Sequence, residues 1–109
     1  MKEFIFFFRG GKTSNATEEQ LQDHEDAWDD WMDELEEGGK LIDGLPLRDR
    51  GVMVTSDGMQ EADFSTDHGI TGYLILECTD LDDATEIASD CPIHDFGGMV
   101  EVRELINER

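Results

Sequence analysis

Two short apolar segments constrain the fold more than any other feature of the sequence. Residues 2–9 (KEFIFFFR) and 70–77 (ITGYLILE) each contain a run of successive apolar residues, and both are far shorter than a buried helix. This pattern predicts two strands that are apolar on both faces. A sheet built on such strands must cover both of its faces with other apolar surface.

Turn and capping residues divide the rest of the chain into short elements. Thr17 and Gln20 form a capping-box pattern that predicts a helix running to the Gly38-Gly39 stop. Asp80 caps a second helix, and Pro92 forbids its continuation. Further strands are predicted at residues 40–47, 51–56 and 97–105, with a turn at residues 56–58 that returns the chain toward Phe64.

The order strand, helix, strands, strand, helix, strand predicts an α+β fold. It matches the ferredoxin-like split βαβ arrangement, with an extra hairpin inserted after the first helix. The 109 residues suffice for one core, so a single domain over residues 1–109 is expected. Two helices cover only one face of the sheet, and a second copy packing on the other face is the simplest remedy; a homodimer is therefore expected.

The chain is strongly acidic. Its 28 Asp and Glu residues against 8 Lys and Arg residues give a net charge of −20, which disfavours nucleic acid and anionic membranes as partners. No segment approaches the roughly 20 apolar residues of a membrane helix, and residues 4–8 are too short for a signal-peptide core, so a cytoplasmic protein is expected. A solvated acidic face, a high-salt cytoplasm or a basic protein partner would each explain the acidity.

The cysteines and histidines indicate no disulfide framework and no metal site. Cys78 and Cys91 are the only two cysteines, and reduced, half-buried thiols are predicted for both. The three histidines and two cysteines show neither H-x-x-x-H nor C-x-x-C spacing. Phosphate-loop and serine-nucleophile motifs are absent as well, so no cofactor is predicted.

Several stretches resemble the YCII-related domain family. MKEFIFFFR, GGKLIDGLPL, GITGYLILECTDLDDATEIASDCPI and CPIHDFGGMVEVREL occur in the family's order over essentially the whole chain. The resemblance implies a ferredoxin-like fold that pairs into a dimeric α+β barrel, and an active site built from a histidine on the first helix and the aspartate of a D-G-P-F motif. No D-G-P-F occurs here; Asp63 is the best counterpart by position, and Asp57 is the competing choice.

The first predicted helix carries one histidine in the middle of its apolar side. Because helical residues advance by about 100° each, His24 shares one arc with apolar residues. These are Leu21, Trp28, Trp31, Met32 and Leu35. One interpretation is a core-edge histidine bonded to backbone or water. The other, which the family resemblance favours, is a catalytic residue paired with Asp63, since a histidine exchanges protons near neutral pH and a carboxylate fixes its tautomer.

Two further residues are candidates for binding a ligand. Trp28, one turn after His24, is either a flat apolar wall or plain core. Arg9, at the end of the first strand, is either a cation for an anionic ligand or one half of a surface salt bridge. Two functions remain open: a small enzyme that performs proton transfer or hydrolysis on a small organic molecule, and a non-catalytic small-molecule-binding or interaction domain. The surroundings of His24 discriminate between them.

Overall fold

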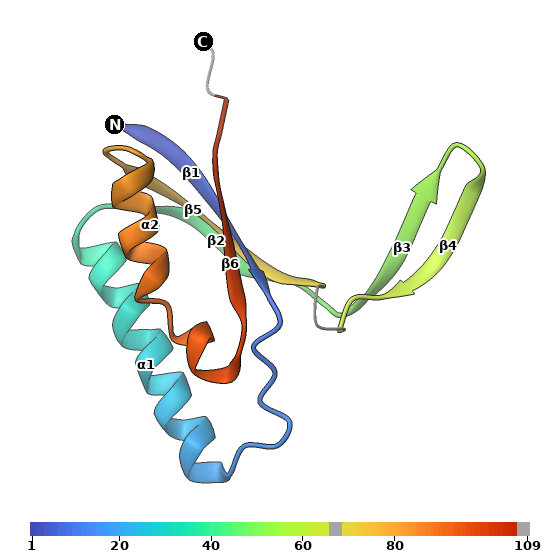
Figure 1. Cartoon of the computed structure of the whole chain (residues 1–109), viewed down its shortest axis with the longest axis horizontal. Coiled ribbons are helices and arrows are strands. Elements are labelled where there is room, and N and C mark those ends of the chain that lie inside the picture. Colours follow the sequence, from blue (N-terminus) through green and yellow to red (C-terminus); the bar gives the residue numbers. More distant parts are fainter. Residues whose placement is uncertain (66–68, 107–109) are drawn as a thin grey trace.

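The computed structural model describes residues 1–65 and 69–106, in which a four-stranded antiparallel sheet carries both helices on one side (Figure 1). The elements are β1 (Lys2–Arg9), α1 (Glu18–Glu37), β2 (Leu41–Pro46), β3 (Arg50–Thr55), β4 (Gly58–Asp63), β5 (Ile70–Cys78), α2 (Leu81–Ser89), the 3-10 turn η1 (Pro92–Phe96) and β6 (Met99–Glu104). The strand order β2-β5-β1-β6 is that of a ferredoxin-like sheet, with β3 and β4 as the inserted hairpin. The predicted α+β fold is confirmed.

The central strand β1 is apolar on both faces, as the sequence predicts. Phe4, Phe6 and Phe8 are buried beneath the helices, whereas Ile5 and Phe7 between them point to the opposite face because side chains alternate along a strand. The neighbouring β5 follows the same pattern. Its Tyr73 and Ile75 lie opposite Phe7 and Ile5 on the face without helices, which is called the open face below.

Both helices begin at the predicted caps. Thr17 accepts a hydrogen bond from the backbone N–H of Gln20, whose side chain accepts one from the Thr17 N–H in return. The Asp80 side chain accepts one from the backbone N–H of Asp83 at the start of α2. Beyond α2 the chain forms the 3-10 turn η1, which begins at Pro92 and which the sequence pattern did not predict.

The two cysteines require a correction. Cys78 and Cys91 are 0% and 2% exposed, so the prediction of half-buried thiols was wrong. Both side chains belong to the core between the sheet and α2, where no water remains to stabilise a thiolate. Burial raises the pKa of Cys78 and raises the pKa of Cys91 to about 12.

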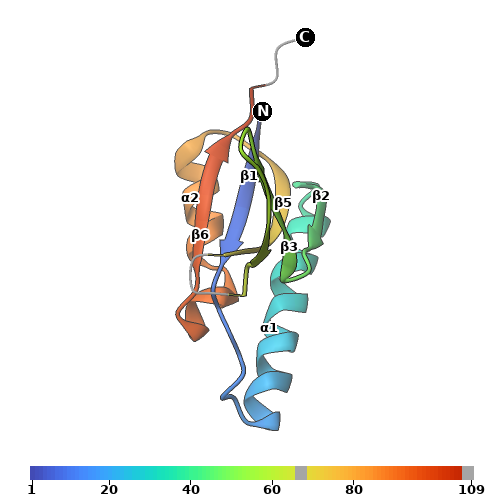
Figure 2. The same cartoon turned by 90° about the vertical axis from the view of Figure 1, so that its right-hand side faces the viewer.

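The inserted hairpin stands apart from the rest of the molecule. β3 and β4 form a separate two-stranded sheet, and within residues 1–65 and 69–106 these strands pair only with each other. The hairpin projects from the side of the main sheet that faces away from α1 and α2 (Figures 1 and 2). Among the described residues, no helix is both long and apolar enough to cross a membrane.

Candidate functional site

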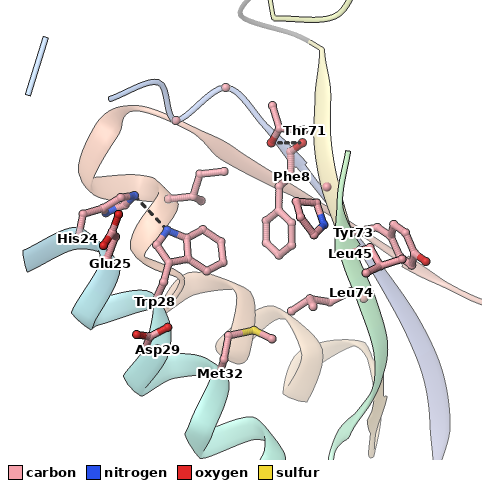
Figure 3. A pocket seen from close by; sticks show the side chains of 16 residues that line it. Phe8, His24, Glu25, Trp28, Asp29, Met32, Leu45, Thr71, Tyr73 and Leu74 are labelled. Carbon is pink, nitrogen blue, oxygen red and sulfur yellow. Dashed lines mark hydrogen bonds between the residues drawn. The ribbon is translucent and has the colours of Figure 1, made fainter. Parts of the chain in front are cut away.

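A cavity of about 520 Å³ opens between α1 and the end of the sheet at which β1 stops (Figure 3). Its lining combines helix side chains, strand ends and three stretches of glycine backbone. The lining residues are Phe8, Gly10, Gly11, His24, Glu25, Trp28, Asp29, Met32, Gly44, Leu45, Pro46, Thr71, Gly72, Tyr73, Leu74 and Ile93. The volume suits a ligand of small-molecule size.

The interior wall is apolar and partly aromatic. The rings of Phe8 and Trp28 meet edge to face with centroids 5.3 Å apart, a favoured aromatic geometry. In Figure 3, Phe8 and Leu74 point from the sheet toward Trp28 and Met32 on the helix. Gly44 lets β2 lie close against β5 in this wall, because a Cβ there would lie 2.7 Å from the Tyr73 carbonyl oxygen.

His24 and Trp28 are joined by a hydrogen bond at the helix side of the cavity. The indole Nε1–H of Trp28 donates to Nε2 of His24 over 3.0 Å (Figure 3). An indole nitrogen only donates, so Nε2 must supply its lone pair and the neutral ring must carry its proton on Nδ1. Trp28 therefore selects one tautomer of His24. From the sequence, we expected a carboxylate to do this.

The other ring nitrogen of His24 has no acceptor within the described residues. Its Nδ1 is buried, and the ring packs against Phe96 of η1 with centroids 4.5 Å apart. A buried donor without a partner costs roughly 1–3 kcal/mol. His24 is thus not the satisfied core-edge histidine of the first interpretation; it is held by one hydrogen bond and by aromatic contacts.

The charged residues around the cavity are acidic. Glu25 and Asp29 line it from α1, beside His24 and Trp28 (Figure 3), and no lysine or arginine is among the described lining residues. The whole chain adds to this negative field with its net charge of −20. An anionic ligand would meet repulsion here, whereas an uncharged or cationic ligand would not.

Of the four residues proposed from the sequence, His24 and Trp28 line the cavity, and Arg9 and Asp63 are not among its lining residues. Arg9 forms an ion pair with Glu101 of β6, with Nη2 3.0 Å from Oε1, in keeping with its alternative interpretation as part of a salt bridge. Asp63 ends β4 on the exposed hairpin, where hydrogen bonds from Ser65 lower its pKa. The competing Asp57 lies in the turn at the hairpin tip. One subunit thus supplies no Asp63 side chain to this cavity, and the pairing of His24 with Asp63 stays a prediction.

The comparisons with known proteins agree with this architecture. The family model of the YCII-related domain matches residues 5–109. The chain belongs to the YCII-related domain family. Its structure is similar to that of 5-chloro-2-hydroxyhydroquinone dehydrochlorinase from Burkholderia phenoliruptrix AC1100 in complex with 2,5-dihydroxybenzoquinone, with a TM-score of 0.60 and 16% identity over 97% of this chain and 95% of that chain. At this identity the likeness shows the fold, and no curated protein matches the chain.

Part of the cavity of this YCII-related domain was not predicted from the sequence. Ile93 lines the cavity and Phe96 covers the His24 ring, yet both belong to η1 and lie 69 and 72 residues beyond His24 in the chain. Glu25 and Asp29 were not among the candidates proposed from the sequence, although their spacing from Trp28 places them at the edge of its apolar stripe. That edge position was the available signal for the acidic rim.

Proposed function

We propose that the cavity binds a small, flat organic molecule and that His24 exchanges a proton with it. The observation that carries the proposal is the imidazole at a largely apolar cavity, with its Nε2 lone pair held by Trp28. Apolar cavities with a few placed polar groups are the usual form of a small-molecule site. The dehydrochlorinase of similar fold is in complex with a quinone, and this supports a ring compound as the ligand class.

The chemistry follows from the tautomer. A ligand hydroxyl that displaces the Trp28 N–H from Nε2 can transfer its proton there, so that the ligand O–H bond breaks and an N–H bond forms on His24. Both ring nitrogens of the resulting imidazolium are donors, so Trp28 can no longer donate to Nε2. Its N–H, already displaced from Nε2 by the ligand, can instead donate to the oxyanion left on the ligand. Glu25, which neighbours His24 at the rim, stabilises the imidazolium charge.

The alternative function is a non-catalytic binding site. It is favoured by one specific observation, namely that no carboxylate bonds the His24 Nδ1 in the described structure. A binding site tolerates this arrangement, whereas an Asp-assisted catalyst needs the carboxylate within hydrogen-bond reach.

Binding and turnover are tested separately. Trp31→Phe leaves Trp28 as the single tryptophan, and its fluorescence is titrated with substituted phenols, hydroquinones and quinones. For each compound that binds, solvent-deuterium incorporation and product formation are followed in this variant and in the same variant with His24→Gln. Catalysis predicts that His24→Gln keeps the dissociation constant within about threefold and lowers turnover by about 10²-fold or more. Binding without any turnover supports the alternative, and quenching by none of these compounds refutes the site.

The open face of the sheet supports a second proposal, a homodimer. Ile5, Phe7, Tyr73 and Ile75 are only half-buried there, and Leu45 beside Tyr73 is 60% exposed. A contiguous apolar surface of this kind on a soluble domain marks an interface. A stable monomer in sedimentation experiments at micromolar concentration would refute the dimer.

A further inference from the structure

The hairpin of β3 and β4, residues Arg50–Asp63, is called the arm here. In the part of the chain that the structure describes, its strands pair only with each other, and it extends from the open-face side of the sheet without packing on it (Figures 1 and 2). A two-stranded hairpin that stands alone is marginally stable in water, because it has no second layer to bury its side chains. The arm therefore needs a covering surface that one subunit does not provide.

One face of the arm carries exposed apolar side chains that a second surface could cover. Val54 lies directly opposite Met59, and Val52 shares their face because strand side chains alternate. Val54 is 72% exposed, Met59 is 65% exposed and Val52 is 50% exposed. The other face carries one large apolar side chain of the arm, Met53, opposite the polar Gln60. The apolar stripe of Val52, Val54 and Met59 thus occupies the tip half of one face, and Glu61 opposite Val52 marks its charged border.

The charge distribution decides what can approach this stripe. Residues 38–56, which include β2 and β3, contain three basic and two acidic residues, a net charge of +1 in a chain of −20. Two copies of so acidic a protein repel each other except where acids are scarce. β2 lies at one edge of the open face and β3 begins the arm, so this weakly basic segment joins the two apolar surfaces, whereas the tip and β4 add the acidic residues Asp57, Glu61 and Asp63.

We infer that the arm of each subunit lies across a second copy of the chain, with the stripe of Val52, Val54 and Met59 on the partner. The inference rests on the proposed dimer. A partner that packs on the open face occupies the side from which the arm extends. In a pair related by two-fold symmetry, the arm of each subunit is covered by the other subunit. The dimer is then held by two surfaces, the open face and the exchanged arms.

Matched single substitutions separate the two surfaces. Val54→Glu places a charge within the stripe, and Met53→Glu places the same charge on the opposite face of the same hairpin. Phe7→Glu disrupts the open face. All three lie outside the helix-covered core, and near-ultraviolet circular dichroism checks that this core is intact. Sedimentation then gives the dimer dissociation constant of each variant.

Val54→Glu is expected to raise that constant by about a hundredfold, roughly tenfold for each of two arms, and Met53→Glu by less than about threefold. Hydrogen exchange gives a second measurement: arm amides are expected to exchange at least about tenfold more slowly in concentrated, dimeric protein than in dilute, monomeric protein.

The outcomes distinguish the two proposals. If the protein dimerises and Phe7→Glu dissociates it while Val54→Glu behaves like Met53→Glu, the dimer stands and the arm inference is wrong. If arm amides are equally protected in monomer and dimer, the arm needs no partner and the inference is overturned. If the protein is a monomer at every concentration, both proposals fail. Binding of that monomer to lipid vesicles through Val54 would then identify a lipid surface as the partner of the apolar stripe.

Discussion

Replacing Trp28 by phenylalanine tests the central feature of the site. The substitution keeps an aromatic ring against Phe8 but removes the N–H that donates to His24 Nε2 over 3.0 Å. A buried hydrogen bond contributes about 1 kcal/mol net. The free energy of unfolding should therefore fall by about 1 kcal/mol, which corresponds to about 4 °C in Tm for a domain of this size. Urea unfolding and thermal melts measure both quantities.

The tautomer of His24 gives the sharper assay. In the native protein, long-range ¹H–¹⁵N correlation spectra of the imidazole should show neutral His24 with its proton on Nδ1, because Trp28 occupies Nε2. In Trp28→Phe this selection is lost, and the Nε2–H form should become populated. A native spectrum that already shows Nε2–H would refute the reasoning, whatever the stability of the variant.

A second tryptophan provides the control. Trp31 lies on the same face of α1, and its Nε1–H donates to the carbonyl oxygen of Ile87 over 3.3 Å. Trp31→Phe removes a comparable hydrogen bond but leaves His24 untouched, so its His24 spectrum should match the native one. A double-mutant cycle of His24→Ala with Trp28→Phe should give a coupling of about 1 kcal/mol, and an additive cycle would contradict a direct bond.

Three further predictions concern the core and the surface. Leu76→Ala, at a side chain that is 0% exposed, should lower the free energy of unfolding by about 3–5 kcal/mol in urea; a loss below about 1 kcal/mol would place this leucine outside the core. The pKa of Cys91 is raised to about 12 in the folded protein, against about 8.5 for a free thiol. The folded protein therefore holds the Cys91 proton more tightly than the unfolded chain does. The stability that this group contributes is complete below pH 8.5 and should decline toward pH 12, and the decline should be less steep in Cys91→Ala. The native thiol should not be alkylated at pH 8. Sodium chloride from about 0.01 M to 1 M should raise Tm, because the Debye length falls from about 30 Å to 3 Å and the like charges of α1 are screened; a flat or falling Tm would contradict this.

Local rules of sequence were sufficient for most of the fold. β1 follows from eight residues that are apolar on both faces, and both helix starts follow from side chains that cap their own backbone, Thr17 and Asp80. These signals act over a few residues and so can be read without knowledge of the rest of the molecule. The turn η1 escaped because a 3-10 turn after Pro92 has no hydrophobic period of its own.

The site was predictable only where it depends on helical periodicity. His24 and Trp28 are one turn apart, so both could be placed on one face of α1 from the sequence. Their hydrogen bond could not be foreseen, because it depends on the rotamers that Phe8 and Phe96 impose from other elements. The end of β1 gave no indication that Arg9 would pair with Glu101, since the register of β6 brings these two residues together.

The described part of the chain leaves two of its features uncompensated, and both support the binding proposals made for them. The buried Nδ1 of His24 lacks an acceptor among the described residues, at a cost that a purely structural side chain such as leucine would not incur. The arm exposes Val54 and Met59 on a hairpin that has no second layer. Departures of this kind from local rules concentrate at functional sites, where a ligand or partner supplies the missing contacts. On these grounds we propose a small molecule for the cavity at His24 and a second copy of the chain for the arm.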